Sequence, residues 1–340
     1  RAAVRDLVFD ALRQRRSAAA LGGGLSGRGL ILGLLRAAGQ EALFSGEGHA
    51  PPPPAPEEAG RPPDPVERLD LPDWLLPELR ASLGPDLQAI AEALRHRAPV
   101  FLRVNLARAD LAAASSLLAA EGIVTRPHPL SPGALEVVER ARKVQASAAY
   151  RAGLVELQDL SSQAVVDALP LAEGMKVLDH CAGGGGKTLA MAGRARLRLF
   201  AHDANPRRMA DLPERARRAG VAVALTDRPE GQAPFDLVLV DAPCSGSGSW
   251  RRDPEGKWTI TPEALDRTIR TQREILDRVA PMVGPGGVLA YATCSLLRRE
   301  NGDQAEAFLD RHPEFARERA LTLTPIQGGD GFFLAIFRRQ

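Results

Sequence analysis

The sequence predicts an α/β protein with a doubly wound parallel sheet, preceded by a small α+β module and a short helical N-terminal region. From Gly153 to the end, short Val/Leu runs alternate with amphipathic helical segments, as in successive β–α–β crossovers. The run Phe235–Asp241 is apolar and is followed by turn residues, as expected of a buried parallel strand. A proline-rich stretch at 46–72 separates the N-terminal residues from the rest.

The composition is that of an ordinary globular chain of about two domains. It has 340 residues, of which 44% are hydrophobic and 25% charged, and a net charge of +2 that gives no strong overall attraction to nucleic acid. Three cysteines are too few for a disulfide framework and indicate a reducing, cytoplasmic environment. No apolar run reaches the roughly 18 residues of a membrane span. We expect a monomer that binds no membrane and no metal.

The first half of the chain predicts three regions. Residues 1–45 form an arginine-rich helical region, because Val4, Leu7 and Val8 recur at helical spacing. Residues 46–72 form a semi-rigid linker with polyproline character. Residues 73–150 form the α+β module, with helices expected at 74–82, 85–95 and 109–120 and strands at 99–105, 123–126 and 135–138. Gly122 is expected to end the third helix in the left-handed conformation.

Residues 151–340 form the doubly wound domain. Its strands are expected at 176–178, 197–201, 221–225, 237–240 and 288–292, with a final antiparallel strand at 331–337. Its helices are expected at 161–169, 186–195, 206–218, 261–279 and 301–311.

The first strand of this domain leads into a turn with four consecutive glycines, Asp179-His-Cys-Ala-Gly-Gly-Gly-Gly-Lys-Thr188. Glycines at such a turn let the backbone approach a ligand, with the N–H groups of the helix start facing it. A Walker phosphate loop is excluded because Cys181 stands where that motif needs its first glycine. The dinucleotide-binding fingerprint fails at its last glycine, so a nucleoside-binding turn is the remaining prediction.

Acidic residues end the next two strands. Asp203 is placed to accept hydrogen bonds from ribose hydroxyls, and Asp227 to bond an adenine amino group. One acid at a strand end is often a helix cap, but Asp179, Asp203 and Asp227 end three successive strands. This repetition favours a nucleoside site.

All three cysteines follow strands of the same sheet. Cys181, Cys244 and Cys294 come after the first, fourth and fifth strands, and therefore fall at its ligand-binding edge. Cys244 and Cys294 could be buried hydrophobic residues, since most isolated cysteines are inert. Because a thiolate is a strong nucleophile near neutral pH, two of them beside a nucleoside site indicate covalent chemistry on a substrate.

Together these motifs resemble the RNA cytosine carbon-5 methyltransferases, specifically the bacterial Sun-like 16S ribosomal RNA enzymes. The resemblance extends over about residues 73–337. It rests on the glycine turn and on Leu102-Arg-Val-Asn105, Gln158–Gln163, Asp241-Ala-Pro-Cys244, Arg251-Arg-Asp-Pro254, Lys257-Trp258, Thr293-Cys-Ser295 and Asp330-Gly-Phe-Phe333. It implies a Rossmann-like class I methyltransferase domain.

The resemblance also implies the catalytic roles. Cys294 would add to carbon 6 of the cytosine, and Cys244 would assist proton removal and the elimination that frees the enzyme. Asp241 would bond ring nitrogen 3 and the exocyclic amine. Lys187 would orient the base or stabilise the thiolate. The chain retains Lys187 although only four of its 44 basic residues are lysine.

The same resemblance implies S-adenosylmethionine as the cofactor and RNA as the partner. The cofactor would be held by Cys181, Ala182, Gly183, Gly184, Gly185, Gly186, Lys187, Asp203, Arg208, Asp227 and Asp241. RNA would meet Arg251, Arg252, Lys257 and Trp258, where cationic and aromatic side chains alternate. A solvated loop with packed tryptophans explains that last pattern equally well.

Two departures from the family pattern stand out. Gly183 and Gly184 replace the Ala-Pro of the commoner turn, and the N-terminal region is shorter than the helical RNA-binding domain of many relatives. Three alternatives stay open: a transfer RNA methyltransferase, a catalytically silent RNA-binding assembly factor, and a methyltransferase for protein or small molecules. The last has no need for paired thiols.

Overall fold

The computed structural model describes residues 2–340; Arg1, which belongs to the predicted helical region, lies outside the described residues. The chain forms two compact units. The first contains the chain up to Ala98 together with Ser249–Pro262, and the second contains Pro99–Gly248 and Glu263–Gln340. Each unit is described separately.

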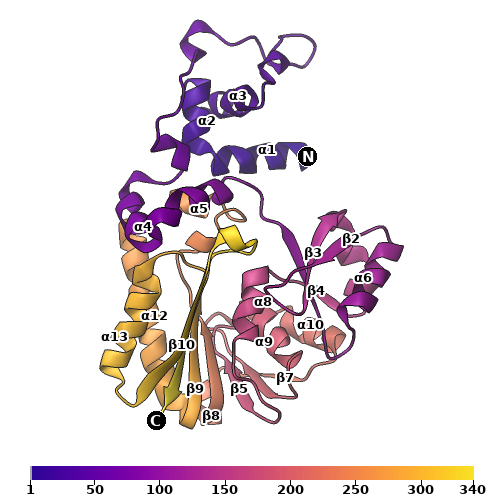
Figure 1. The fold of residues 1–340 in the computed structure, drawn as a ribbon, viewed down its shortest axis with the longest axis vertical. Helices are drawn as coiled ribbons and strands as arrows, with labels where there is room; N and C mark the ends of the chain where they lie inside the picture. Colours follow the sequence, from indigo (N-terminus) through magenta and orange to yellow (C-terminus); the bar gives the residue numbers. More distant parts are fainter. Residues whose placement is uncertain (1) are drawn as a thin grey trace. The chain divides into compact units, whose positions relative to one another are not determined.

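The second unit contains a seven-stranded sheet in the order β10-β11-β9-β8-β5-β6-β7 (Figure 1). The strands are β5 (Lys176–Asp179), β6 (Arg198–Ala201), β7 (Val223–Leu225), β8 (Phe235–Asp241), β9 (Val283–Thr293), β10 (Phe315–Leu323) and β11 (Phe332–Arg339). The pairs from β7 to β9 are parallel, and β11 is antiparallel to both neighbours. The predicted doubly wound sheet with a late antiparallel strand is confirmed. The strand order reverses between β5 and β8, which is where ligands bind in such sheets.

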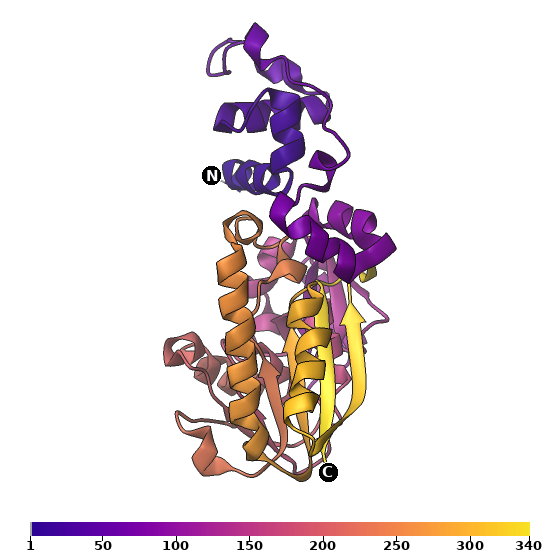
Figure 2. The same ribbon diagram turned by 90° about the vertical axis from the view of Figure 1, so that its left-hand side faces the viewer.

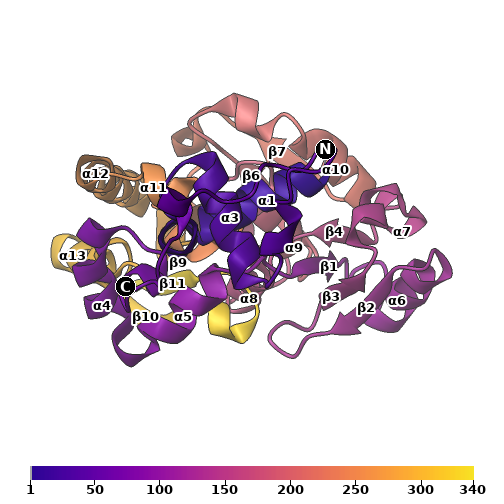
Figure 3. The same cartoon turned by 90° about the horizontal axis from the view of Figure 1, so that it is seen from above.

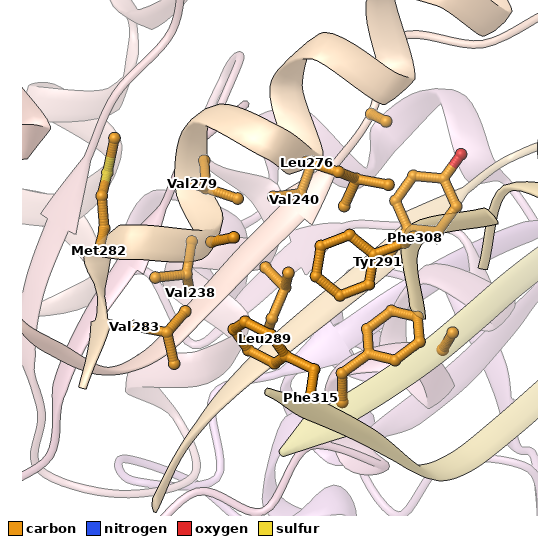
Figure 4. Packing of buried hydrophobic residues seen from close by; sticks show 14 of the residues in the cluster. Val238, Val240, Leu276, Val279, Met282, Val283, Leu289, Tyr291, Phe308 and Phe315 are labelled. Carbon is orange, nitrogen blue, oxygen red and sulfur yellow. The ribbon is translucent and has the colours of Figure 1, made fainter. Parts of the chain in front are cut away.

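Helices cover both faces of this sheet. One face packs against α8 (Leu160–Asp167) and α9 (Gly186–Ala192), and the other against α12 (Pro262–Val279) and α13 (Gly302–Arg311). Figure 2 shows α12 and α13 side by side, and Gln304 of α13 donates to the Ile269 carbonyl of α12 over 2.6 Å. Alternate residues of β8 point to opposite faces, as a buried strand requires. Val238 and Val240 meet Leu276 and Phe308 of the α12/α13 layer in Figure 4.

Two elements of this sheet differ from the predictions. Strand β10 was not predicted, because its sequence Phe-Ala-Arg-Glu-Arg-Ala-Leu-Thr-Leu is charged and mostly exposed, as is common for an edge strand. The predicted helix 206–218 is divided into a 3₁₀ turn, Pro206–Met209, and α10, Leu212–Ala219. Pro213 has no backbone N–H, so it favours the first turn of a new helix.

A four-stranded antiparallel sheet, in the order β2-β3-β1-β4, forms the small α+β module of the same unit. Figure 3 shows these strands next to one another with α6 (Leu111–Ala120) and α7 (Ala148–Arg151) beside them. The strands are β1 (Val100–Val104), β2 (Val124–Pro127), β3 (Ala134–Glu139) and β4 (Val155–Leu157), of which β4 was not predicted. Gly122 has φ +75°, as expected after α6.

The first unit is helical, as predicted for its N-terminal region. Its helices are α1 (Ala2–Arg13), α2 (Arg15–Gly22), α3 (Gly27–Ala37), α4 (Leu76–Leu83), α5 (Leu87–Leu94) and α11 (Gly256–Thr259). The backbones of α2 and α3 approach so closely that a Cβ on Gly33 would lie 1.9 Å from the Ala18 carbonyl oxygen. Among residues 2–340 no single helix is long and apolar enough to cross a membrane; only α2 and α3 taken together, bent by 90°, reach that length and composition.

The proline-rich segment 46–72 packs onto these helices. Arg28 donates to the Pro52 carbonyl over 2.9 Å, and the Arg61 N–H donates to the Ala20 carbonyl over 2.8 Å. Asp70 is fully buried, and its carboxylate accepts hydrogen bonds from the Ser17 N–H and hydroxyl. These contacts make the segment part of the first compact unit, in place of the extended spacer that its composition predicts.

Candidate active site

The carboxyl ends of β5, β8 and β9 bring together the side chains that the sequence singles out in the second unit. Asp179 ends β5, Asp241 ends β8, and Cys294 directly follows β9. Cys244 lies three residues beyond β8, in a loop whose Ala242 N–H bonds the Ala292 carbonyl of β9 over 2.9 Å. Parallel strands therefore deliver residues far apart in the sequence to one edge of the sheet.

The two cysteines form a pair. The sulfur atoms of Cys244 and Cys294 lie 3.4 Å apart, within hydrogen-bond distance. The hydrogen bond with Cys294, together with burial, raises the pKa of the Cys244 thiol well above its ordinary value. The contact with Cys294 and burial therefore favour the protonated form of Cys244.

An ion pair between a buried lysine and a partly exposed aspartate joins the start of α9 to the end of β8. The Nζ atom of Lys187, in the first turn of α9, is 2.7 Å from Oδ2 of Asp241 and 4.8 Å from the centre of the Phe332 ring. Burial disfavours the ammonium charge, but Asp241, the hydrogen bond to it and the nearby Cys294 outweigh that effect and raise the pKa of Lys187. The raised pKa keeps Lys187 cationic, and Cys294 lies close enough to interact with it electrostatically.

The glycine turn is built on positive φ angles. Gly183 and Gly185 have φ of +51° and +77°, which disfavour any residue with a Cβ. A Cβ on Gly185 would also lie 2.2 Å from a methyl carbon of Leu212. Gly183 adopts this φ without strain, whereas an alanine in the same conformation would be strained.

Asp203 supports this turn. It is buried, accepts a hydrogen bond from the Gly183 N–H over 3.0 Å, and lies 3.2 Å from the half-exposed guanidinium of Arg208. Asp227 follows β7 and is exposed. The structure thus joins Asp203, Arg208 and the turn, whereas no hydrogen bond or ion pair among the described residues, 2–340, links Asp227 to them.

Asp179 and His180 are buried beneath the turn. Burial raises the pKa of Asp179 to about 7, although the Thr188 hydroxyl donates to one of its oxygens over 2.6 Å. Its other oxygen has no hydrogen-bond partner among residues 2–340. Burial lowers the pKa of His180 to about 4. A buried carboxyl oxygen left open in this way fits a turn that receives a polar ligand.

Cys181 stands apart from the cysteine pair. Its sulfur lies 3.7 Å from Nδ1 of His180, and burial followed by repulsion from Asp179 raises the pKa of its thiol. It therefore lacks the reactivity expected of a nucleophile.

The residues predicted to contact RNA lie in the first unit. Lys257 is 1% exposed and donates from Nζ to the Arg13 carbonyl over 2.9 Å, and Trp258 donates from Nε1 to the Leu12 carbonyl over 2.6 Å. Arg251 is 4% exposed, and its carbonyl accepts a hydrogen bond from Nε of Arg13. Of the four residues, Arg252 is exposed and Trp258 is partly exposed. The side chains of Arg251 and Lys257 are buried in this arrangement, and a buried side chain offers RNA no surface.

Sequence reasoning missed two buried residues of the second unit. Arg103 is buried and donates to the Gly186 carbonyl over 3.3 Å, so the small module supports the glycine turn. Glu300, in the 3₁₀ turn Arg298–Glu300, is fully buried beside both cysteine loops. Arg103 lies in the motif Leu102–Asn105, which carries part of the family resemblance. Nothing in the sequence near Arg103 indicates that it bonds Gly186, which is 83 positions away.

Comparison with known families decides the assignment. The profile described as 16S rRNA methyltransferase RsmB/F matches residues 166–338, half of the chain, and that of an RsmF/B-like ferredoxin-like domain matches residues 71–145. The chain belongs to the RsmB/F family. The predicted resemblance and the methyltransferase-type Rossmann-like fold are confirmed.

Among curated relatives, the Ribosomal RNA small subunit methyltransferase B of Citrobacter koseri is 35% identical over 281 residues. The match covers 78% of this RsmB/F chain but 65% of that protein, so the chain spans about two thirds of the relative's length.

Solved structures share the fold. The crystal structure of PH0851 has a TM-score of 0.80 at 22% identity, over 99% of this chain and 90% of the other. NSun6 from Pyrococcus horikoshii, solved with SFG, has a TM-score of 0.69 at 18% identity, over 79% and 98%.

Proposed function

We propose that this chain transfers a methyl group from S-adenosylmethionine to carbon 5 of a cytosine in 16S ribosomal RNA, through a covalent adduct with Cys294. The observation that carries the proposal is the 3.4 Å separation of the Cys244 and Cys294 sulfur atoms beside the Lys187–Asp241 pair. A methyltransferase for protein or small molecules has no use for two thiols in contact.

The two cysteines suit the chemistry of methylation at carbon 5 of cytosine. Carbon 5 of cytosine is too weakly nucleophilic to accept a methyl group directly. Cys294, as the thiolate, adds to carbon 6 and forms a carbon–sulfur bond, and the electron pair of the 5,6 double bond makes carbon 5 nucleophilic. The ammonium of Lys187 stabilises the thiolate before attack, in keeping with its raised pKa and its closeness to Cys294.

Cys244 and Asp241 have the two remaining roles, proton removal and recognition of the base. Cys244 takes the proton from carbon 5 as its thiolate, and its raised pKa makes that thiolate a strong base. The electron pair of the broken carbon–hydrogen bond reforms the 5,6 double bond, the bond from carbon 6 to sulfur breaks, and Cys294 leaves as the thiolate. Asp241, about one third exposed, bonds nitrogen 3 and the exocyclic amine of the base. To reach these groups the cytosine has to leave its stack.

The residues of the glycine turn fit S-adenosylmethionine, which supplies the methyl group when bound. Gly183 and Gly185 leave the turn without side chains, Asp203 is fixed next to it, and an oxygen of Asp179 is open to a polar partner. Cys181 to Lys187, Asp203, Arg208, Asp227 and Asp241 would hold the cofactor. For RNA contact the exposed Arg252 and the partly exposed Trp258 remain the candidates in the Arg251–Trp258 segment.

The test is incubation of the protein with labelled S-adenosylmethionine and unmodified 16S ribosomal RNA, followed by nucleoside analysis. We expect 5-methylcytosine, and its loss in Cys294→Ala. Cys181→Ala serves as the matched cysteine variant and should change the KM for S-adenosylmethionine more than kcat.

Each alternative predicts another result. Methylation of transfer RNA in place of 16S RNA would replace the proposed substrate and leave the proposed chemistry unchanged. Failure of S-adenosylmethionine to bind in calorimetry would favour a silent assembly factor and contradict the proposal.

A further inference from the structure

Glu300 is a fully buried carboxylate that the proposed chemistry does not use. It ends the 3₁₀ turn that precedes α13, six residues after Cys294 and far in sequence from Cys244. Burying a carboxylate is unfavourable unless its oxygens are hydrogen-bonded. The partners of this side chain therefore indicate its role.

Those partners belong to both cysteine loops. Oε1 of Glu300 accepts from the N–H of Ser245 over 2.8 Å and from Nε2 of Gln272 over 3.1 Å. Oε2 accepts from the hydroxyls of Ser245 and Ser295, each over 2.5 Å. Ser245 directly follows Cys244, and Ser295 directly follows Cys294. One side chain thus ties together the residues next to the two sulfur atoms.

Further hydrogen bonds fix the same loops to each other. The N–H of Gly248 donates to the carbonyl of Cys294 over 2.9 Å, and the Ser247 and Ser295 hydroxyls lie 3.1 Å apart. Gln272 also donates to the Pro243 carbonyl, and the Tyr291 hydroxyl donates to the Glu300 carbonyl over 2.6 Å. Glu300 and Ser247 both bond the two cysteine-flanking serines through their side chains, and Glu300 is the one whose two oxygens accept from them and from Gln272.

We propose that Glu300 is a positioning residue that holds the Cys244 and Cys294 thiols in contact through Ser245 and Ser295. The assignment rests on the proposed function, because that function requires both thiols to reach one base. The alternative is a carboxylate that only stabilises the fold, which would leave the placement of the sulfur atoms unchanged when it is replaced.

Disulfide formation measures that placement without RNA. Diamide takes two electrons and two protons from the paired thiols, and the sulfur atoms have to approach by only about 1.3 Å to reach the bond length of roughly 2.05 Å. With Cys181→Ala as the background, only Cys244 and Cys294 remain. The rate of their cross-linking then reports how well they are held together.

We expect Glu300→Gln to slow this cross-linking at least fivefold, because an amide nitrogen cannot accept the bonds that one carboxylate oxygen accepts. Loss of the negative charge by itself would lower the pKa of Cys244 and speed the reaction, so a slower reaction reports lost positioning. Glu306→Gln, an exposed carboxylate on α13 paired with Arg317, is the matched control and should leave the rate unchanged.

In turnover, Glu300→Gln should lower kcat while the KM for S-adenosylmethionine stays within twofold of wild type. Cross-linking at an unchanged or higher rate would overturn the role of Glu300. If the wild type transferred no methyl group to any RNA, the proposed function would be contradicted. The cross-linking rates would still show whether Glu300 holds the two thiols in contact. If Glu300→Gln does not fold, Ser295→Ala is the substitute variant. It removes one of the hydroxyl groups that donate to Glu300 and should also slow cross-linking.

Discussion

Two buried lysines, one in each unit, have opposite electrostatic surroundings. Lys187 is 8% exposed and faces the carboxylate of Asp241, whereas Lys257 is 1% exposed and bonds a backbone carbonyl. The pKa of Lys187 is raised. Burial lowers the pKa of Lys257 to about 7, and Asp70 offsets this only in part.

The comparison shows that retention of a lysine in an arginine-rich chain does not by itself indicate a functional cation. A carboxylate partner preserves the charge in a buried site, whereas a carbonyl accepts a hydrogen bond from the ammonium or the neutral amine alike. The partner, and not burial, separates the proposed catalytic lysine from the structural one.

The largest effect is expected from removing the charge of Lys187. Lys187→Met should lower kcat by about 100-fold or more, because a buried charge that stabilises a reacting group contributes on the order of 10² to 10³ in rate. Lys143→Met, an exposed lysine of the same unit, is the control. Single-turnover methyl transfer at saturating S-adenosylmethionine measures the effect; equal rates for the two variants would remove Lys187 from the chemistry.

A smaller effect is expected in the stability of the first unit. The folded pKa of Lys257 is about 7, while an unfolded lysine has a pKa of about 10.4. Between these values the unfolded chain binds more protons, so this group makes the free energy of unfolding rise with pH, by at most about 1.4 kcal/mol per pH unit. Below pH 7 the lysine is charged in both states and contributes no slope.

Lys257→Met should remove that rise. Denaturant unfolding of wild type and variant at pH 6, 8 and 9 gives the difference, which should grow with pH above 7 in favour of the wild type. A difference that is independent of pH would mean that Lys257 stays charged in the folded protein.

The sequence predicts the edge of the sheet well. Asp241, Cys244 and Cys294 could be placed together because parallel strands end at a common edge, whatever their separation along the chain. The left-handed conformation of Gly122 was predictable because a positive φ favours glycine, and the glycine turn because consecutive glycines let the backbone approach a ligand.

Tertiary contacts were not predictable in this way. Lys257 and its partner Arg13 are 244 positions apart, and no local pattern shows that the segment Ser249–Pro262 returns to the N-terminal helices. No sequence motif marks Glu300 either. Its role depends on contacts with Ser245 and Ser295, and those contacts are visible only in the folded structure. The edge strand β10 was not predicted because most of its residues are exposed and several are charged. Its sequence therefore lacks the alternation of apolar and polar residues that indicates a strand.

The central claim is that Cys294 attacks the base and Cys244 releases the product. It is tested most directly by the covalent protein–RNA adduct that remains after denaturation, in the presence of S-adenosylmethionine and 16S RNA. Cys244→Ala should accumulate the adduct, with the RNA attached at Cys294, and Cys294→Ala should form none. An adduct in Cys294→Ala, or none in either variant, would contradict the account.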